Sequence, residues 1–221
     1  MSARSTDAAS QFANRAEAGR LLADELREYA GRDDVIVLGL PRGGIPVAYE
    51  VARALEVPLD AFLVRKLGLP GHEELAMGAI ASGGTRVLNA DVLDLHPVSE
   101  ERIAAVAAQE EEELERRERE YRRDRGPLDL EGHTVILVDD GLATGSTMRA
   151  AVAAIRASRP AGIVVAVPVA ARETCDALRR EVDAVVCPRT PDPFQAVGVW
   201  YRTFDQTTDE EVRDCLARAA G

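Results

Sequence analysis

The sequence predicts an α/β fold built on an open, mostly parallel sheet that is flanked by helices. Short, continuous runs of β-branched and aliphatic residues alternate with stretches of helical periodicity, and such uninterrupted runs are typical of strands covered on both faces. Two of the runs lead directly into glycine-rich or acidic loops before a helix, which is the order of a βα unit. A chain of 221 residues can bury a sizeable core. We expect a single domain over residues 1–221, with its core at about 32–188.

The first part of the chain contains a helix, a strand and a second helix. An amphipathic helix is expected over residues 11–30, with Ser10 as its N-cap and Gly31 as its terminator. A buried strand at residues 35–38 runs into a loop with two adjacent glycines, and a helix follows up to Leu55. Adjacent glycines let backbone N–H groups point at an anion, although a plain tight turn has the same pattern.

A third strand is expected at residues 59–64, followed by a glycine-rich excursion that ends at Gly84. Five glycines and one proline predict a mobile or hairpin-like loop here. Two basic residues leave the end of the strand, and an imidazole and two carboxylates lie further along the loop. These residues are Arg65, Lys66, His72, Glu73 and Glu74.

A long charged helix is expected over residues 98–125, with Ser99 as its N-cap. Glu–Arg pairs at i,i+4 spacing support it along its length. Its apolar stripe is thin, so the helix is either an exposed arm or a surface that contacts a partner, and we favour the exposed arm. The stripe consists of Ile103, Val106, Leu114 and Tyr121. The pairs are Glu112–Arg116, Glu113–Arg117, Glu115–Arg119 and Glu118–Arg122.

The central segment, residues 134–148, carries the residues in which we expect the chemistry. A buried strand at 135–138 ends in Asp139 and Asp140, and a small, hydroxyl-rich loop leads into an alanine-rich helix at 148–158. Ligands gather at the carboxyl ends of parallel strands. The unpaired N–H groups of the loop, the helix dipole and three hydroxyls suit a monophosphate. The loop is formed by Ala143, Thr144, Gly145, Ser146 and Thr147.

The remainder of the chain continues the alternation of strands and helices. An aromatic-rich segment at about 189–206 interrupts the pattern and is expected to form a small C-terminal hood. The other elements expected here are strands at 162–169 and 182–187 and helices at 172–180 and 209–220, the last capped by Thr208.

The composition restricts the partners and the compartment. The chain has 27 basic and 38 acidic residues and a net charge of −11, which disfavours nucleic acid as its main partner. The N-terminal residues lack the apolar core of a secretory signal and no later run reaches membrane-spanning length, so we expect a cytoplasmic protein without a membrane partner. Three widely spaced cysteines indicate neither a disulfide framework nor a CxxC metal site, and the histidines lack metal-ligand spacing.

The two acids, three residues and T-G-S-T of the central segment resemble the 5-phosphoribosyl 1-diphosphate (PRPP) motif of type I phosphoribosyltransferases. The opening of the chain, with its spaced Phe, Arg, Ala-Gly and Leu-Leu-Ala, is similar to a poorly characterised bacterial group of these proteins. The resemblance implies that Asp139 and Asp140 serve catalysis by holding the ribose hydroxyls and stabilising positive charge. It also implies that residues 143–147 bind the 5′-phosphate.

The loop after the first strand resembles the pyrophosphate loop of purine salvage phosphoribosyltransferases, through its R-G-G sequence. Arg65 and Lys66 stand where related enzymes place a basic residue against pyrophosphate, which implies a catalytic role; the alternative is a pair of solvated charges. The residues implied in pyrophosphate binding by the first loop are Pro41, Arg42, Gly43 and Gly44.

The order P-D-x-F-x-x-V-G in the hood resembles the base-binding segment of hypoxanthine–guanine phosphoribosyltransferases. It implies that Phe194 stacks on a base and that Gln195 reads the edge of the base. The glycine-rich excursion holds residues that either meet the acceptor when it closes or stay at the surface, namely His72, Glu73 and Glu74. Other hood aromatics are expected in the core, namely Trp200, Tyr201 and Phe204.

Two positions depart from the family pattern. Ala143 stands where the hypoxanthine–guanine enzymes have an acid that handles the base proton, so we expect weak or no activity of that type. Arg202 stands roughly where those enzymes have an aspartate for a second metal, so no second Mg²⁺ is expected there. No side chain is assigned as a direct metal ligand.

These features predict Mg²⁺-dependent transfer of a phosphoribosyl group from PRPP to a nitrogenous small-molecule acceptor, such as a nucleobase, with release of pyrophosphate. The expected cofactor is Mg²⁺, and a homodimer is compatible with the resemblance. The alternative is a PRPP-binding regulator or interaction module without catalysis. A P-loop NTPase is excluded because G-x-x-x-x-G-K-[ST] does not occur.

Overall fold

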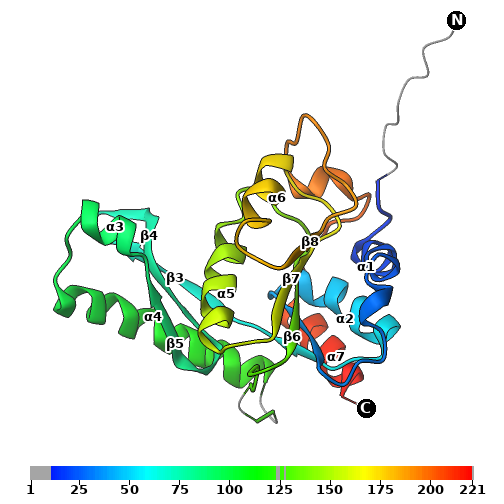
Figure 1. Ribbon diagram of the computed structural model, residues 1–221, viewed down its shortest axis with the longest axis horizontal. Coiled ribbons are helices and arrows are strands. Elements are labelled where there is room, and N and C mark those ends of the chain that lie inside the picture. Colours follow the sequence, from blue (N-terminus) through cyan, green and yellow to red (C-terminus); the bar gives the residue numbers. More distant parts are fainter. Residues whose placement is uncertain (1–10, 123–124, 127, 221) are drawn as a thin grey trace, which may run out of the picture.

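A parallel five-stranded sheet forms the centre of the molecule (Figure 1). The computed structural model describes residues 11–122, 125–126 and 128–220. The strand order is β2-β1-β6-β7-β8, and each neighbouring pair runs parallel. The predicted α/β fold with a parallel sheet is therefore confirmed. The strands are β1 (Val35–Gly39), β2 (Leu59–Ala61), β6 (Thr134–Val138), β7 (Gly162–Ala166) and β8 (Ala184–Val186).

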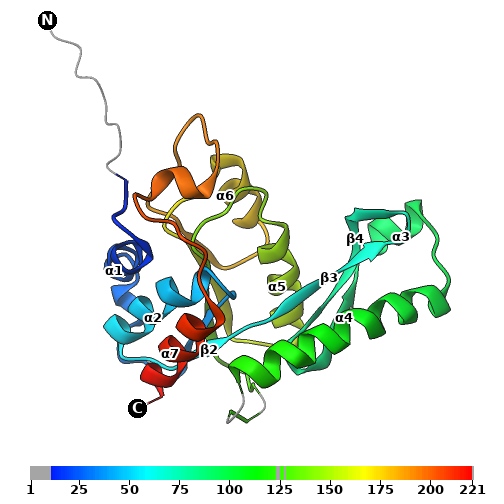
Figure 2. The same cartoon turned by 180° about the vertical axis from the view of Figure 1, so that it is seen from behind.

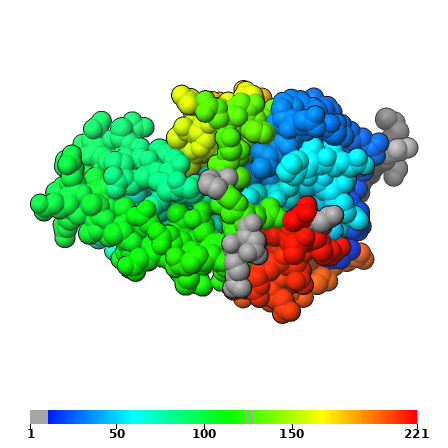
Figure 3. All heavy atoms as spheres, turned by 90° about the horizontal axis from the view of Figure 1, so that it is seen from below, coloured from blue at the N-terminus to red at the C-terminus, as the bar shows by residue number. Residues whose placement is uncertain are grey.

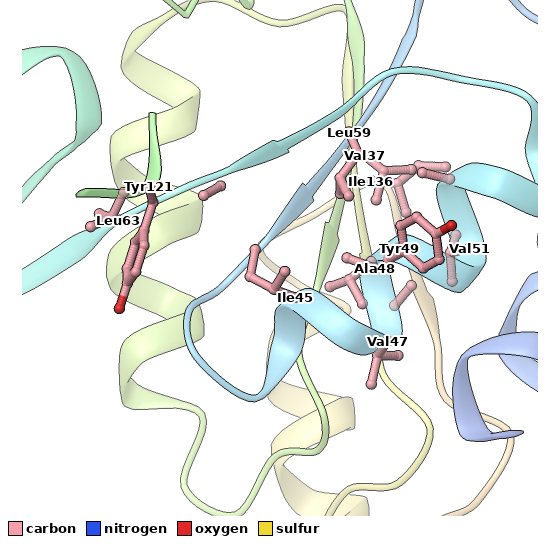
Figure 4. Close-up of a cluster of buried hydrophobic side chains, with 14 of the residues drawn as sticks. Val37, Ile45, Val47, Ala48, Tyr49, Val51, Leu59, Leu63, Tyr121 and Ile136 are labelled. Atoms are coloured by element: carbon pink, nitrogen blue, oxygen red, sulfur yellow. The ribbon is translucent and has the colours of Figure 1, made fainter. Parts of the chain in front are cut away.

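Helices cover both faces of this sheet. On β6, Ile136 and Val138 belong to the hydrophobic cluster beneath α2, whereas Val135 and Leu137 belong to the cluster beneath α5. All four side chains are fully buried, which explains why the run does not alternate with polar residues. Figure 4 shows Ile136 among the side chains of the first cluster. The helices are α1 (Arg15–Asp24), α2 (Gly44–Leu55) and α7 (Asp209–Ala219) on one face and α5 (Ser146–Ala157) and α6 (Arg172–Leu178) on the other.

A second, antiparallel sheet and a long helix form an arm that projects from this body (Figures 1 and 3). The glycine-rich excursion forms a hairpin, as the sequence indicated, and a third strand joins it in the order β3-β4-β5. Gly71 lies at the turn with a φ of 83°, a value that favours glycine. The arm consists of β3 (Val64–Leu69), β4 (His72–Ala81), a 3-10 turn (Ser82–Gly84), β5 (Thr85–Leu88), α3 (Ala90–Leu95) and α4 (Glu100–Tyr121).

The long helix α4 begins after Ser99, the predicted N-cap, whose side chain accepts a hydrogen bond from the Arg102 N–H group. It ends at Tyr121, four residues earlier than expected. Its stripe is not an unpaired exposed face, because Ile103, Leu114 and Tyr121 are buried in the cluster that also contains residues of α2 and α7. The rest of the helix is mostly solvent-exposed, as expected for an arm.

Three of the four predicted i,i+4 ion pairs of α4 are present. The fourth is replaced, because Arg116 contacts Glu113 at 2.7 Å and Glu120 at 3.2 Å instead of Glu112. Arg116 therefore uses neighbours on both sides along the helix.

The predicted start of the first helix is wrong. α1 begins at Arg15, and its N-cap is Asn14. The predicted cap Ser10 lies outside the described residues. The residues just before α1 are extended because they pair with the hood: the N–H group of Phe12 donates to the carbonyl of Trp200 at 2.8 Å.

The predicted end of that helix and the predicted third strand also need correction. α1 ends at Asp24, and a separate 3-10 turn (Arg27–Tyr29) precedes Gly31. β2 ends at Ala61, and Val64 already belongs to β3 of the other sheet. Residues 59–64 look like a single strand because five of the six are apolar, and this hid the change of sheet between Ala61 and Val64.

The elements after the central strand agree with expectation apart from their ends. α5 begins two residues early, at Ser146, because Gly145 turns the chain at a φ of 70°. β7 and β8 are shorter than predicted. Thr208 caps α7, as its sequence indicated, and it also forms a capping box with Glu211. None of the helices in the described ranges is long and apolar enough to cross a membrane.

Candidate active site at the carboxyl edge of the sheet

The two predicted anion loops lie side by side because their strands are neighbours. β1 pairs with β6 in a register that sets Gly39 opposite Val138, so both loops leave the same edge of the sheet. A Cβ atom built on Gly43 would lie 2.1 Å from Oδ2 of Asp140, and one built on Gly44 would lie 2.8 Å from the carbonyl oxygen of Val138. Only glycine fits at this contact, which joins the R-G-G loop to the two acids.

Asp139 is held at the centre of this contact. Its Oδ1 accepts the N–H group of Asp140 at 2.8 Å. Burial raises the pKa of Asp139 well above its usual value, and the nearby charge of Asp140 adds to the rise. Two carboxylates in one buried place cannot both carry full charge without a compensating cation.

Arg15 of α1 supplies that cation, and the sequence analysis assigned it no role. Its Nε and Nη2 both lie 2.9 Å from Oδ2 of Asp140. Burial still raises the pKa of Asp140, although Arg15 opposes the rise. The hydroxyl of Tyr201 donates to the backbone carbonyl of Asp140 at 2.6 Å, so the hood also contacts this acid.

The same guanidinium joins α1 to the hood. Nη1 of Arg15 donates to the carbonyl of Asp205 at 2.7 Å, and the guanidinium lies 4.0 Å from the ring centroid of Phe204. Phe204 in turn lies 4.9 Å from the ring of Tyr201. These contacts make Arg15 the link between α1, the acids and the hood.

The hydroxyl-rich loop turns at Gly145 and places two of its hydroxyls at the N-terminus of α5. Gly145 adopts the left-handed conformation, and Ser146 and Thr147 form the first turn of α5, where helix N–H groups are unpaired. The hydroxyl of Thr174 donates to the carbonyl of Ala143 at 2.5 Å and fixes the start of the loop. Thr174 was not singled out in the sequence because it lies on a later helix.

The two basic residues expected to act together, Arg65 and Lys66, point in different directions. Lys66 and Arg65 lie within β3 of the arm rather than at the end of a parallel strand. Nζ of Lys66 lies 3.2 Å from Oγ of Ser146, so this lysine reaches the hydroxyl-rich loop. Arg65 points to α4 and contacts Glu110 at 2.6 Å. Successive residues of a strand face opposite sides, which explains the division.

The R-G-G loop begins with a cis peptide bond between Pro41 and Arg42. Nη1 of Arg42 lies 3.7 Å from Oδ1 of Asp209, the first residue of α7. An open pocket of about 520 Å³ lies beside this loop. Its walls include Arg15, Arg42, Asp140, Val197, Phe204, Gln206 and Thr207.

The two residues predicted to bind a base are in the hood but do not line this pocket. Phe194 is half-buried and packs against the small cluster that contains Phe12 and Tyr201. Gln195 is exposed. Tyr201 is buried in that cluster, which confirms the prediction of a core aromatic at this position. Trp200 and Phe204 are only partly buried against the cluster, and Phe204 also lines the pocket.

His72 and Glu73 lie at the far end of the arm. Together with Leu75 and His96 they line a hollow of about 330 Å³ there, away from the two anion loops (Figure 1). The side chain of Glu74 lies outside the described part of the chain. Within the described residues, no group of three or more His, Cys, Asp and Glu side chains is arranged to hold a metal ion.

The parallel sheet carries the two predicted anion loops side by side at one edge, with two buried acids in contact with them. A family model for the phosphoribosyl transferase domain matches residues 8–201. The chain therefore belongs to the phosphoribosyl transferase domain family.

Similar proteins support this assignment. Two Mycobacterium tuberculosis proteins, "Putative phosphoribosyl transferase MT0597" (strain CDC 1551 / Oshkosh) and "Putative phosphoribosyl transferase Rv0571c" (strain ATCC 25618 / H37Rv), are each 46% identical over 208 residues. The matches cover 94% of this chain but 47% of each mycobacterial protein, so the chain spans about half their length. The crystal structure of TT1426 from Thermus thermophilus has a TM-score of 0.87 and 42% identity, and the match covers 96% of this chain and 100% of that chain.

Proposed function

We propose that this protein transfers the phosphoribosyl group of PRPP to a nitrogenous acceptor and releases pyrophosphate. The observation that carries the proposal is the contact between Gly43 and Asp140, which brings the two anion loops together around the acid pair. PRPP has a phosphate at each end of its ribose and needs two such loops. The names of the mycobacterial relatives agree with this activity.

In the proposed binding mode each loop holds one end of PRPP. The 5′-phosphate lies on residues 143–147, where the helix N–H groups and hydroxyls meet it, and Lys66 adds a positive charge from the arm. The diphosphate lies on residues 41–44 next to Arg42. The ribose then spans the acid pair, and Asp139 and Asp140 accept hydrogen bonds from its hydroxyls.

The chemistry follows from this placement. The bond between the anomeric carbon and the diphosphate oxygen breaks, and its electron pair leaves with the diphosphate. The acceptor nitrogen forms the new bond to the same carbon and loses a proton. The carboxylates stabilise the positive charge that develops on the ribose, and positioning of the two reactants supplies much of the rate. No protein nucleophile is required.

Mg²⁺ fits this arrangement as an ion that binds together with the substrate. It prefers oxygen ligands, keeps several waters and is usually bound through substrate phosphates rather than in an all-protein cage. The diphosphate supplies such oxygens, and when bound the ion neutralises charge on the leaving group. The residues of loop 41–44 would hold the diphosphate that carries the ion.

The acceptor is proposed to be a flat nitrogen heterocycle bound under the hood. Phe194 and Gln195 are candidates from the sequence, and the pocket wall at Val197 and Gln206 is a second candidate from the structure. Ala143 offers no acid for the acceptor proton, so solvent or the departing pyrophosphate takes it. Hypoxanthine and guanine are therefore expected to be poor acceptors.

A second candidate function is a PRPP-binding regulator without catalysis. The ion pair of Arg15 with Asp140 favours the regulator, because a carboxylate that is already paired with a cation stabilises positive charge on the ribose less well. A pyrophosphate-release assay with PRPP and a panel of nucleobases, with and without Mg²⁺, separates the two functions. The enzyme gives base-dependent release that requires Mg²⁺. Tight PRPP binding with no release from any base selects the regulator.

A further inference from the structure

One carboxylate connects the R-G-G loop, residues 41–44, to the C-terminal end of the long helix α4. Oδ1 of Asp209 lies 3.7 Å from Nη1 of Arg42 and also accepts a hydrogen bond from the hydroxyl of Tyr121. Tyr121 is the last residue of α4, and Asp209 is the first residue of α7. Figure 2 shows α7 beside this end of α4.

The position of Asp209 is fixed by α7 itself. Thr208 and Glu211 form a capping box, with the Thr208 N–H group 2.8 Å from the Glu211 carboxylate and the Glu211 N–H group 3.1 Å from the Thr208 hydroxyl. One turn further on, Val212 is fully buried in the main core, and so is Leu216 near the end of the helix. The first turn of α7 is therefore a rigid support.

Two further contacts join α7 to the end of α4 and to the segment that follows it. Arg213 of α7 pairs with Glu120 at 2.8 Å, and Nη2 of Arg125 donates to the carbonyl of Leu216 at 2.7 Å. Tyr121 is itself only 6% exposed. Its hydroxyl therefore has little freedom to leave Asp209.

The charge of Asp209 is well compensated. Its carboxylate accepts the Tyr121 hydroxyl, lies at the positive end of α7 and pairs with Arg42, so it repels an incoming diphosphate less than an isolated carboxylate does. The ion pair with Asp209 is made by Nη1 of Arg42, so the other two nitrogens of the guanidinium can bind an anion. An arginine with about a third of its side chain exposed otherwise loses considerable rotamer entropy when it binds.

We propose that Asp209 and Tyr121 are positioning residues that hold Arg42 ready for the diphosphate, which gives the long helix α4 a role at the site. This inference rests on the proposed function, because it assigns the diphosphate to residues 41–44. It predicts that substitutions of Asp209 or Tyr121, which lie outside the anion loops, weaken the binding of the diphosphate and leave the binding of the 5′-phosphate unchanged.

The test compares Asp209→Asn and Tyr121→Phe with a matched control, Glu210→Gln. Glu210 is the exposed neighbour in the same helical turn, so its substitution also removes an acid from the first turn of α7. Calorimetry with Mg²⁺-pyrophosphate and with ribose 5-phosphate gives the two affinities. We expect both test variants to bind pyrophosphate about two- to fivefold more weakly, the range of an exposed ion pair, with ribose 5-phosphate unchanged. Glu210→Gln should match the wild type, and Asp209→Glu should regain part of the loss.

A second readout needs no ligand. The Nε–H resonance of Arg42 in a nitrogen-correlated NMR spectrum should shift in Asp209→Asn and Tyr121→Phe but not in Glu210→Gln. An unshifted resonance, unchanged pyrophosphate affinity in both test variants, or tighter binding in Asp209→Asn would overturn the inference. If the wild type binds neither ligand, the proposed function fails, and the resonance still decides whether the two residues position Arg42.

Discussion

Arg15 and Asp140 form an ion pair through two nitrogens of one guanidinium, each 2.9 Å from the same carboxylate oxygen, although 125 residues separate them in the chain. The pair joins the first helix to the acid that follows the central strand. Only 13% and 15% of the two side chains are exposed. The first helix is therefore part of the candidate site and not only a cover for the sheet.

Removal of Arg15 should destabilise the protein. Arg15→Gln leaves Asp140 nearly buried without its cation, and loss of one partner of such a pair costs about 3 kcal/mol of unfolding free energy. Urea denaturation followed by circular dichroism measures this. Arg20→Gln, on the same helix, breaks a 3.6 Å pair with Glu50 in which the arginine is 55% exposed, so it should cost at most about 1 kcal/mol. Equal losses in the two variants would contradict the buried role of Arg15.

Asp139 should make stability depend on pH with an unusual sign. Its pKa is raised in the folded state, so the folded protein holds this proton more tightly than the unfolded chain does. Stability then falls as the pH rises from the unfolded value, about 3.9, through the higher folded pKa. Asp139→Asn should be more stable than the wild type at pH 7.5, with the difference shrinking toward pH 4. Urea midpoints at a series of pH values measure it, and a difference independent of pH would refute the assignment.

Lys66 should serve the 5′-phosphate. Lys66→Met removes the ammonium group beside Ser146 and should weaken ribose 5-phosphate binding by about tenfold, equivalent to ~1.4 kcal/mol. Calorimetry with ribose 5-phosphate measures the change. Arg86→Met is the control, because it removes a positive charge from an exposed position on β5 of the same arm. A Lys66 effect confined to pyrophosphate would instead support the role that the sequence comparison implied.

The acceptor should bind against the hood, and substitutions there should change the acceptor KM. Phe194→Ala should raise the acceptor KM more than the PRPP KM, since loss of a stacked base costs roughly 1–3 kcal/mol. Val197→Ala tests the neighbouring pocket wall in the same steady-state assay. If Val197→Ala alone moves the acceptor KM, the acceptor lies in the pocket and Phe194 only packs against Phe12 and Tyr201.

Much of the fold could be predicted because its signals are local. Ser99 and Thr208 cap helices through atoms only three residues away, and the apolar run before Asp139 shows that both faces of the strand are covered. The glycines at 43 and 44 indicated an anion loop or a tight turn, but their close approach to Asp140 and Val138 appears only in the structure.

The remaining features depend on contacts that are distant in sequence. The role of Arg15 depends on Asp140 and the hood, and no spacing within α1 reveals it. Arg65 and Lys66 appeared to follow a parallel strand because residues 59–64 look like one strand. In the structure this segment passes from one sheet to the other. Only the placement of the arm against α5 shows that Lys66 reaches Ser146.

The most direct test of the central claim is a calorimetric titration of PRPP, in the presence of Mg²⁺, into the wild type and into the double variant Asp139→Asn/Asp140→Asn. Circular dichroism of both proteins checks that the fold is retained. We predict that the wild type binds PRPP and that the folded double variant binds it much more weakly, because the acids hold the ribose between the two anion loops. Absence of PRPP binding by the wild type, or equal affinity in the folded variant, would contradict the account.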